Sequence, residues 1–313
     1  MQSLAVILEQ PRELGLRAVE LTAPGDDDVI VDVRWSGIST GTERLLWSGR
    51  MPPFPGMGYP LIPGYEAAGL VVGAGSAARQ RIGDHVFVPG ANCYGAVRGL
   101  FGASSSRLVT RQARAVAVDH TLGDRAVLLA LAATAHHALA ARGAELPDLI
   151  VGHGIVGRLL ARLAIALGGE PPTVWEREPC RASGAQGYPV LLPSADNRRD
   201  YGAIYDASGS AGILDELIGR TAKGGEIVLA GFYDTRLDFN FVPAFMREIR
   251  IRVAAEWLPD DLDAVNRLAG SGMLSLDGLI SHAMDARDAT HAYTAAFEDV
   301  SCLKMVLDWR TCT

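Results

Sequence analysis

Short runs of apolar and β-branched residues, each bounded by turn-forming residues, mark the first third of the chain. Four of them read VILE, VIVDVRW, AAGLVVGAG and HVFVPG, at residues 6–9, 29–35, 67–75 and 85–90. Runs of this length between turn-forming residues predict short, twisted strands rather than helices. The first third therefore reads as a small β-rich domain.

After about residue 120 the pattern changes to an alternation of helix-like and strand-like stretches. Helices are predicted over 124–142, 156–167 and 286–298, and strands over 149–151, 173–175, 203–205, 226–230 and 303–307. The runs FVPAF at 241–245 and EIRIRVAAEW at 248–257 also read as strands. Because parallel strands need long return connections, this alternation predicts an α/β fold with a doubly wound parallel sheet.

Composition and charge narrow the class of protein. The chain has 313 residues with 29 Lys+Arg against 36 Asp+Glu, a net charge of −7, which argues against a nucleic-acid-binding surface. Its four cysteines form no CxxC pair, and this usage suits a reducing cytoplasm. The N-terminus lacks the basic region and cleavage site of a secretory signal. The longest weakly polar run, 126–141, is too short for a transmembrane segment and carries His136 and His137.

A glycine-rich turn carries the first functional prediction. Residues 149–163 read LIVGHGIVGRLLARL, which places GxGxxG between a predicted strand and a predicted helix. The first Gly permits the tight turn, the second lets a pyrophosphate approach the backbone, and the third allows close packing of helix on strand. The helix N-terminus offers unpaired amides to the phosphates. The expected cofactor-binding residues here are Gly152, His153, Gly154, Ile155, Val156 and Gly157.

An acidic residue follows where the second strand should end. Glu176 lies 24 residues after Gly152 and is placed to accept from a ribose 2′-hydroxyl, which favours NAD over NADP. Arg177, beside it, could instead stack on the adenine or receive a 2′-phosphate. Alternatively, the glycines serve tight packing alone and Glu176 is an ordinary solvated carboxylate. His153 is expected to be a turn residue without a role in the reaction.

Several segments together resemble the medium-chain dehydrogenase/reductase family. They are SGISTGTE (36–43), PGYEAAGLVVGAG (63–75), GDHVFV (83–88), the glycine motif, DASG (206–209) and KGGEIVLAGF (223–232). The resemblance implies a GroES-like catalytic domain over 1–115, a Rossmann dinucleotide-binding domain over 116–270 and a C-terminal return to the first domain over 271–313. It also implies that Ser208, Gly209, Ala230, Gly231 and Phe232 line the cofactor site, and that strand edges pair into a homodimer.

The departures from the family pattern concern zinc. Zinc-dependent members have a Cys where this chain has Ser39, a His where it has Tyr65, and a Cys, Asp or Glu near Ala130. The lobe of four cysteines that binds a structural zinc is also missing. Because a zinc site needs three N, S or O donors, we expect no metal here.

Without zinc, another group must take the alcohol proton. Tyr65 and Glu66 occupy the former metal neighbourhood, and Ser39 or Thr42 could relay a proton through their hydroxyls. The hypothesis is that Tyr65 accepts the alcohol proton and that the Glu66 carboxylate orients Tyr65. In the alternative, Tyr65 only fills the vacated space and Glu66 pairs with an arginine.

An apolar loop suggests the kind of substrate. The loop between the segments 36–43 and 63–75 carries Trp47, Met51, Phe54, Met57 and Tyr59. Met and aromatic side chains suit a large, flat, apolar ligand. The alternative is a loop packed on its own domain or at a subunit contact.

Within the family, the segments 36–49, 54–69, 152–163 and 296–309 are most similar to members that act on tetrapyrroles in bacteriochlorophyll biosynthesis. That resemblance implies NAD-dependent oxidation of a 3-(1-hydroxyethyl) group to 3-acetyl on a chlorin or bacteriochlorin ring. Two alternatives stay open. One is a zinc-free NADPH quinone or enoyl reductase, and the other is a non-catalytic protein that binds a dinucleotide or a pigment.

Overall fold

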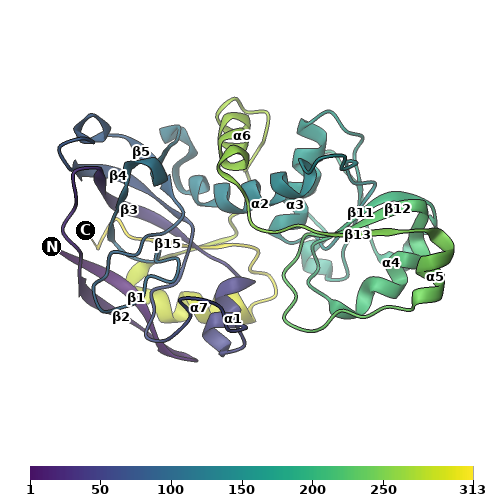
Figure 1. The fold of residues 1–313 in the computed structure, drawn as a ribbon, viewed down its shortest axis with the longest axis horizontal. Helices are drawn as coiled ribbons and strands as arrows, with labels where there is room; N and C mark the ends of the chain where they lie inside the picture. The colour runs from purple at the N-terminus through teal and green to yellow at the C-terminus, as the bar shows by residue number, and fades with distance from the viewer. Residues whose placement is uncertain (313) are drawn as a thin grey trace. The chain divides into compact units, whose positions relative to one another are not determined.

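The computed structural model describes residues 1–312 and divides into two compact units (Figure 1). Unit 1 contains Met1–Ala130 and the chain from Leu276 onward, and unit 2 contains Leu131–Ser275. The C-terminal part of the chain thus returns to the same unit as the N-terminus. Among residues 1–312, no helix combines the length and the apolar character that a bilayer crossing requires.

Unit 1 is built on a mainly antiparallel seven-stranded sheet. Its central strand β3 (Asp28–Ile38) pairs with β4 (Ala67–Ala74), β6 (Arg107–Arg111) and β15 (Met305–Asp308). The sheet is completed by β5 (His85–Val88), β7 (Val116–Ala117) and β14 (His282–Asp285). Alternate residues of β3 are buried, as expected for a strand with one face on the core.

A hairpin and two helices complete unit 1. The hairpin joins β1 (Gln2–Gln10) to β2 (Glu13–Glu20), and the helices are α1 (Thr42–Ser48) and α7 (Ala289–Glu298). Short 3-10 turns occur at η1 (Arg79–Arg81), η2 (Gln112–Arg114), η3 (His120–Leu128) and η7 (Ala286–Asp288). Ala292, Tyr293 and Ala296 of α7 are buried in the same core as alternate residues of β3.

Unit 2 contains a six-stranded, fully parallel sheet in the order β10-β9-β8-β11-β12-β13. The strands are β8 (Leu149–Val151), β9 (Thr173–Trp175), β10 (Val190–Leu191), β11 (Tyr201–Asp206), β12 (Thr221–Leu229) and β13 (Arg250–Val253). This order is that of the doubly wound Rossmann fold, in which ligands bind at the carboxyl ends of the strands where the winding direction reverses.

The helices around this sheet are α2 (Leu129–Leu139), α3 (Ile155–Ala166), α4 (Leu214–Arg220), α5 (Phe241–Arg247) and α6 (Pro259–Gly270). Three 3-10 turns lie in its connections, η4 (Pro179–Arg181), η5 (Pro193–Ala195) and η6 (Ala211–Ile213). The predicted fold class, a Rossmann sheet with a β-rich GroES-like domain, is confirmed. The predicted helix over 124–142 is α-helical only over 129–139, after the 3-10 stretch η3.

One predicted strand is wrong, because residues 241–245 form the helix α5. Asn240, just before α5, donates hydrogen bonds from its backbone N–H and its side-chain amide to Asp215, at 2.7 and 2.6 Å. Pro243 lies in the first turn, where a helix tolerates a missing N–H. The bulky apolar residues that suggested a strand are exposed on this short helix, with Phe241 and Phe245 among the most exposed apolar side chains.

Candidate active site

The ends of two neighbouring strands bring Ser39 and Tyr65 together. Ser39 directly follows β3, and Tyr65 lies just before β4, which pairs antiparallel with β3. Gly64, with φ +91°, turns the chain before Tyr65. The Tyr65 hydroxyl donates a hydrogen bond to Ser39 Oγ at 2.7 Å. Two of the predicted catalytic residues therefore contact each other directly.

The Tyr65 phenol is held in its protonated form. Burial raises its pKa above the usual range, and the nearby carboxylates Glu66 and Glu43 raise it further. Hydrogen bonds with Ser39 and Thr42 oppose the rise without reversing it. At neutral pH Tyr65 is therefore a proton donor, and it can take a proton from a substrate only while it passes its own to a neighbouring hydroxyl.

Glu66 forms an ion pair with Lys304, the residue just before β15. Both side chains are almost completely buried. Gly37 makes room for the pair, because a Cβ there would lie 2.0 Å from Glu66 Oε2 and 2.9 Å from Lys304 Cε. Burial raises the pKa of the Glu66 carboxyl, and Lys304 lowers it. Glu66 is thus paired with a cation, as the alternative interpretation expected, but the cation is a lysine.

A second buried carboxyl, Glu43 in α1, lies beside Ser39. Its Oε1 accepts from the Ser39 backbone N–H at 2.9 Å, and its Oε2 accepts from the Tyr293 hydroxyl at 2.6 Å. The Tyr293 hydroxyl also lies 3.2 Å from Ser104 Oγ. Burial raises the pKa of Glu43 to about 7, with Tyr293 and Ser39 opposing the rise.

The sequence interpretation missed Glu43, Tyr293 and Lys304. Glu43 offered a signal, since it lies within the SGISTGTE segment next to the proposed relay residues. Tyr293 and Lys304 offered none, because they reach this pocket from more than 200 residues further along the chain.

The residues at the family's zinc positions do not fit a zinc ion. Tyr65 and Ser39 are hydrogen-bonded to each other, and the buried side chain of Ala130 is a methyl group that cannot coordinate a metal. Zinc in proteins takes Cys, His or carboxylate ligands in a tetrahedral arrangement. Within residues 1–312, moreover, no three His, Cys, Asp or Glu side chains are grouped so that they could hold a metal ion.

The predicted cofactor turn has the geometry that its glycines suggested. Gly152 directly follows β8 and has φ +94°, a conformation that side chains disfavour. A Cβ on Gly157 would lie 1.8 Å from the Gly152 carbonyl oxygen, so only glycine allows this packing. Helix α3 begins at Ile155, followed by Val156, and no side chain caps its N-terminus. Its first amides are therefore available to an anionic group.

The other predicted cofactor residues lie at the same edge of the sheet. A Cβ on Gly152 would be 3.2 Å from the Cα of Ser208, and one on Gly231 would be 3.1 Å from the Gly209 nitrogen. The loops after β8, β11 and β12 therefore meet there, and Ala230 and Phe232 flank Gly231. Asp206, at the end of β11, orients two of these segments by accepting from the Ser208 N–H and the Tyr233 hydroxyl at 2.9 and 2.8 Å.

Glu176 directly follows β9, and its carboxylate is held by backbone groups. It accepts hydrogen bonds from the N–H groups of His153, Arg177 and Glu178 at 3.0, 2.7 and 2.9 Å. The exposed Arg177 side chain forms a 3.4 Å ion pair with Glu216. The carboxylate is therefore directly linked to the glycine turn through His153.

The His153 ring is buried and does not face the open turn. Its Nδ1 lies 2.7 Å from the Arg181 carbonyl oxygen, and its Nε2 lies 2.9 Å from the Tyr188 hydroxyl. Burial lowers the pKa of His153 to about 4, so the ring is neutral near pH 7. This arrangement agrees with a turn histidine that has no reactive role.

The apolar loop residues pack around the leucines Leu8, Leu46, Leu61 and Leu100 of their own unit. The partly buried side chains on this cluster include Trp47, Met51, Phe54, Met57 and Tyr59. Trp47 also contacts Phe297, with ring centroids 5.5 Å apart. Phe101 belongs to the same cluster and meets the Tyr65 ring edge-on, with centroids 5.5 Å apart. The loop is therefore packed on its own unit, and Phe101 connects it to Tyr65.

Comparisons with known proteins show which proteins this chain is similar to. Residues 25–119 match the family model of the alcohol dehydrogenase GroES-like domain. Two proteins named 2-desacetyl-2-hydroxyethyl bacteriochlorophyllide A dehydrogenase are each 58% identical to this chain and match 99% of both chains. They come from Rhodobacter capsulatus and Cereibacter sphaeroides. The L-galactonate-5-dehydrogenase of Escherichia coli is 27% identical over 88% of this chain and 90% of its own.

Solved structures show the same fold. An alcohol dehydrogenase from E. coli, solved with NADH, has a TM-score of 0.84 at 21% identity and covers 98% of this chain and 99% of its own. The 2R,3R-butanediol dehydrogenase of Bacillus subtilis also reaches 0.84, at 19% identity and the same coverage. At these identities the likeness concerns the fold alone.

Proposed function

Because the chain belongs to the medium-chain dehydrogenase/reductase family, we propose that it oxidises the 3-(1-hydroxyethyl) group of a chlorophyllide or bacteriochlorophyllide to 3-acetyl. In this proposal the hydride acceptor is NAD, no zinc takes part, and the reaction belongs to bacteriochlorophyll biosynthesis in the cytoplasm. The observation that carries it is the 58% identity, over 99% of the chain, to two proteins named for such a substrate.

A nicotinamide dinucleotide fits the residues at the carboxyl edge of the unit 2 sheet. The open N-terminus of α3 and the glycine turn would hold the pyrophosphate, and Glu176 would accept from the ribose hydroxyls. The segments 207–209 and 230–232 would flank the rest of the cofactor. When bound, the cofactor supplies the acceptor for the hydride that leaves the alcohol carbon.

Tyr65 is the residue we propose to receive the alcohol proton. Because its own pKa is raised, it must release its proton as it accepts another. The phenol proton passes to Ser39 Oγ at 2.7 Å, and Ser39 at the same time releases its own hydroxyl proton, directly or through Thr42, to water. Thr42 offers a second hydroxyl at this site. Glu66, paired with Lys304, acts through its charge on the phenol and does not contact the substrate.

The loop of Met and aromatic residues is the proposed wall for the apolar ring of the pigment. Its side chains are only partly buried, and Phe101 joins their cluster to Tyr65. A flat macrocycle resting on Phe54, Met57 and Tyr59 would gain apolar contact without a large rearrangement.

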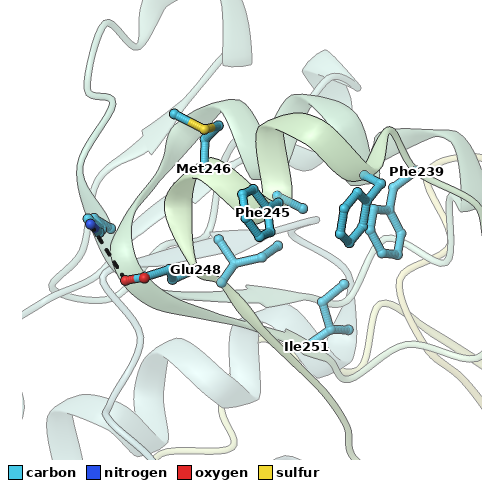
Figure 2. Close-up of a pocket in the computed structure, with 9 residues that line it drawn as sticks. Phe239, Phe245, Met246, Glu248 and Ile251 are labelled. Atoms are coloured by element: carbon cyan, nitrogen blue, oxygen red, sulfur yellow. Dashed lines mark ion pairs between the residues drawn. The ribbon is translucent and has the colours of Figure 1, made fainter.

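We also propose that two copies of the chain associate through α5 and β13. Strand β13 is the last strand of its sheet, and its Ile251 and Val253 side chains are exposed. Beside it, Phe239, Phe245 and Ile251 are among the residues that line a hollow of about 500 Å³ (Figure 2). An exposed apolar surface next to an unpaired edge suits a second copy in a symmetric dimer. Sedimentation should then give twice the chain mass, and a monomer for Phe245→Lys.

The test of the proposed function combines turnover and metal content. The purified protein is incubated with 3-hydroxyethyl bacteriochlorophyllide and either NAD or NADP, while the red absorption band of the pigment is followed. We expect a spectral shift with NAD and no stoichiometric zinc in the same sample. No shift with either cofactor would contradict the dehydrogenase, and binding without turnover would favour a carrier. A strong preference for NADPH in reducing an activated alkene would favour the reductase.

A further inference from the structure

The connection between β9 and β10 in unit 2 is unusual for a parallel sheet. Parallel neighbours are normally joined by a crossover that contains an α-helix. Here residues 177–188, which we call the 177–188 segment, contain only the three-residue turn η4. The segment begins directly after Glu176, the carboxylate proposed to bind the ribose. Its conformation therefore has to be held by side chains rather than by helical hydrogen bonds.

Arg158 of α3 provides most of that support. Its guanidinium is buried and donates to three carbonyl oxygens, those of His153 at 3.0 Å, Arg181 at 3.0 Å and Ser183 at 2.8 Å. Gly184 lies close against it, since a Cβ there would be 2.3 Å from Arg158 Nη1. One buried cation thus ties the glycine turn to the 177–188 segment.

His153 and Tyr188 form a second connection between the same two parts. The neutral His153 ring faces the Arg181 carbonyl oxygen with Nδ1, so Nδ1 carries the proton and Nε2 accepts from the Tyr188 hydroxyl. The two ring nitrogens therefore contact two different residues of the 177–188 segment, Arg181 within it and Tyr188 at its end. The buried ring is saturated with partners and has no free group for a ligand.

The Glu176 carboxylate is held by backbone donors from the same two parts of the chain. Two of its three backbone donors, Arg177 and Glu178, belong to the start of the 177–188 segment, and the third is His153. A carboxylate offers about four acceptor sites, so about one is left for a ribose hydroxyl. Held by three N–H groups, it cannot swing away from an approaching 2′-phosphate, whose charge it repels.

We propose that Arg158 is a positioning residue that sets the preference for a dinucleotide with a free ribose 2′-hydroxyl over one with a 2′-phosphate. It acts through the 177–188 segment and Glu176 and does not contact the cofactor. This inference rests on the proposed function, because it takes the protein to bind a nicotinamide dinucleotide.

The test measures dinucleotide affinity directly. Wild type and Arg158→Met are titrated with NADH and NADPH by nicotinamide fluorescence, and kcat and KM are measured where turnover allows. We expect the ratio of the two Kd values to fall by about tenfold or more in the variant, with weaker NADH binding and little change in kcat. Released from its fixed position, Glu176 would no longer exclude the 2′-phosphate, and Arg177 could approach it.

Arg220→Met is the matched control. Arg220 is also a buried arginine of unit 2 and donates to the carbonyl oxygens of Pro193, Asp196 and Arg198. It is the last residue of α4, just before β12 begins, at the amino ends of the strands. Its loss should lower stability in the same way as the loss of Arg158 but leave the NADH to NADPH ratio unchanged.

An unchanged ratio in folded Arg158→Met, or an equal change in Arg220→Met, would overturn the inference. If Arg158→Met does not fold, Tyr188→Phe and Gly184→Ala disturb the same segment, and an unaltered ratio in both would also overturn it. Wild type that binds NADH and NADPH equally would contradict the role of Arg158 but not the dehydrogenase. Wild type that binds neither would overturn both proposals.

Discussion

The pocket around Tyr65 in unit 1 and the glycine turn in unit 2 both bury titratable groups, but they respond to pH in opposite directions. In the pocket, burial raises the pKa of Glu43 to about 7. At the turn, burial lowers the pKa of His153 to about 4. In both places burial favours the neutral form, which for an acid is protonated and for histidine is deprotonated. The two regions can therefore be distinguished by the pH range over which each destabilises the fold.

The two regions also differ in whether backbone groups or side chains form the site. The turn acts through backbone amides and glycine conformations, whereas the pocket acts through side chains that come from distant parts of the chain. Its ion pair between Glu66 and Lys304 is fully enclosed, while Glu176 at the turn is held by backbone donors. A change in a single side chain should therefore lower stability more in the pocket than at the turn.

The largest expected effect on stability comes from Lys304→Met. It leaves the Glu66 carboxylate buried without its cation, which should lower the free energy of unfolding by about 3–5 kcal/mol at pH 7. Urea denaturation measures this loss. The double variant Glu66→Gln/Lys304→Met should recover most of it. Lys223→Met, which removes an exposed lysine 3.6 Å from Glu248, is the control and should change little. A Lys304→Met protein as stable as wild type would contradict the buried pair.

Glu43→Gln should remove a pH dependence that belongs to the pocket. Because the folded pKa of Glu43 lies above the unfolded value of 4.5, wild type should lose stability as the pH rises from about 4.5 to 7. The loss should reach about 3 kcal/mol and be absent from the variant. The free energies of unfolding of both proteins at pH 5 and pH 8 test this. If wild type and Glu43→Gln differ in free energy of unfolding by the same amount at pH 5 and pH 8, the predicted role of Glu43 is refuted.

His153→Asn should remove a pH dependence of the opposite sign. The folded pKa of His153 lies below the unfolded value of 6.5, so wild type should lose stability as the pH falls through this range. Between pH 6.5 and 5 the loss should be about 2 kcal/mol. The Asn amide can still donate to the Arg181 carbonyl oxygen but does not titrate. Equal acid sensitivity of the melting temperature in both proteins would show that another group is responsible.

The smallest effect is expected in the apolar loop. Phe54 is only partly buried against the leucine cluster, so Phe54→Ala should remove about 1 kcal/mol of contact with the pigment. The KM of the Phe54→Ala variant for the pigment should rise roughly fivefold, with kcat unchanged. The KM for NAD, measured in the same assay, is the internal control. A fall in kcat without a change in KM would mean that the loop affects the chemical step instead.

The parts that the sequence predicted well are those that depend on local backbone geometry. The run from Leu149 to Gly157 specifies a buried strand, a tight turn and a helix start within nine residues, and each appears as expected. Arg158 is also marked in the sequence, because together with Arg162 it interrupts an otherwise apolar helix face.

The parts that could not be predicted depend on distant contacts. Lys304 reaches Glu66 only because β15 pairs with β3, and Tyr293 reaches Glu43 from α7. Residues 241–245 resemble a buried strand in sequence, because five positions are too few for a helical periodicity to be distinguished, and they form an exposed helix instead.

The most direct test of proton transfer without zinc is the turnover number of chelator-treated Tyr65→Phe with 3-hydroxyethyl bacteriochlorophyllide and NAD. Wild type treated in the same way should keep its activity. The variant should lose about 10²- to 10⁴-fold in kcat with little change in KM, because the hydroxyl that contacts Ser39 is gone. Tyr94→Phe, which removes another buried hydroxyl of unit 1, should retain kcat. Full turnover by Tyr65→Phe, or activity in wild type that requires added zinc, would contradict the assignment.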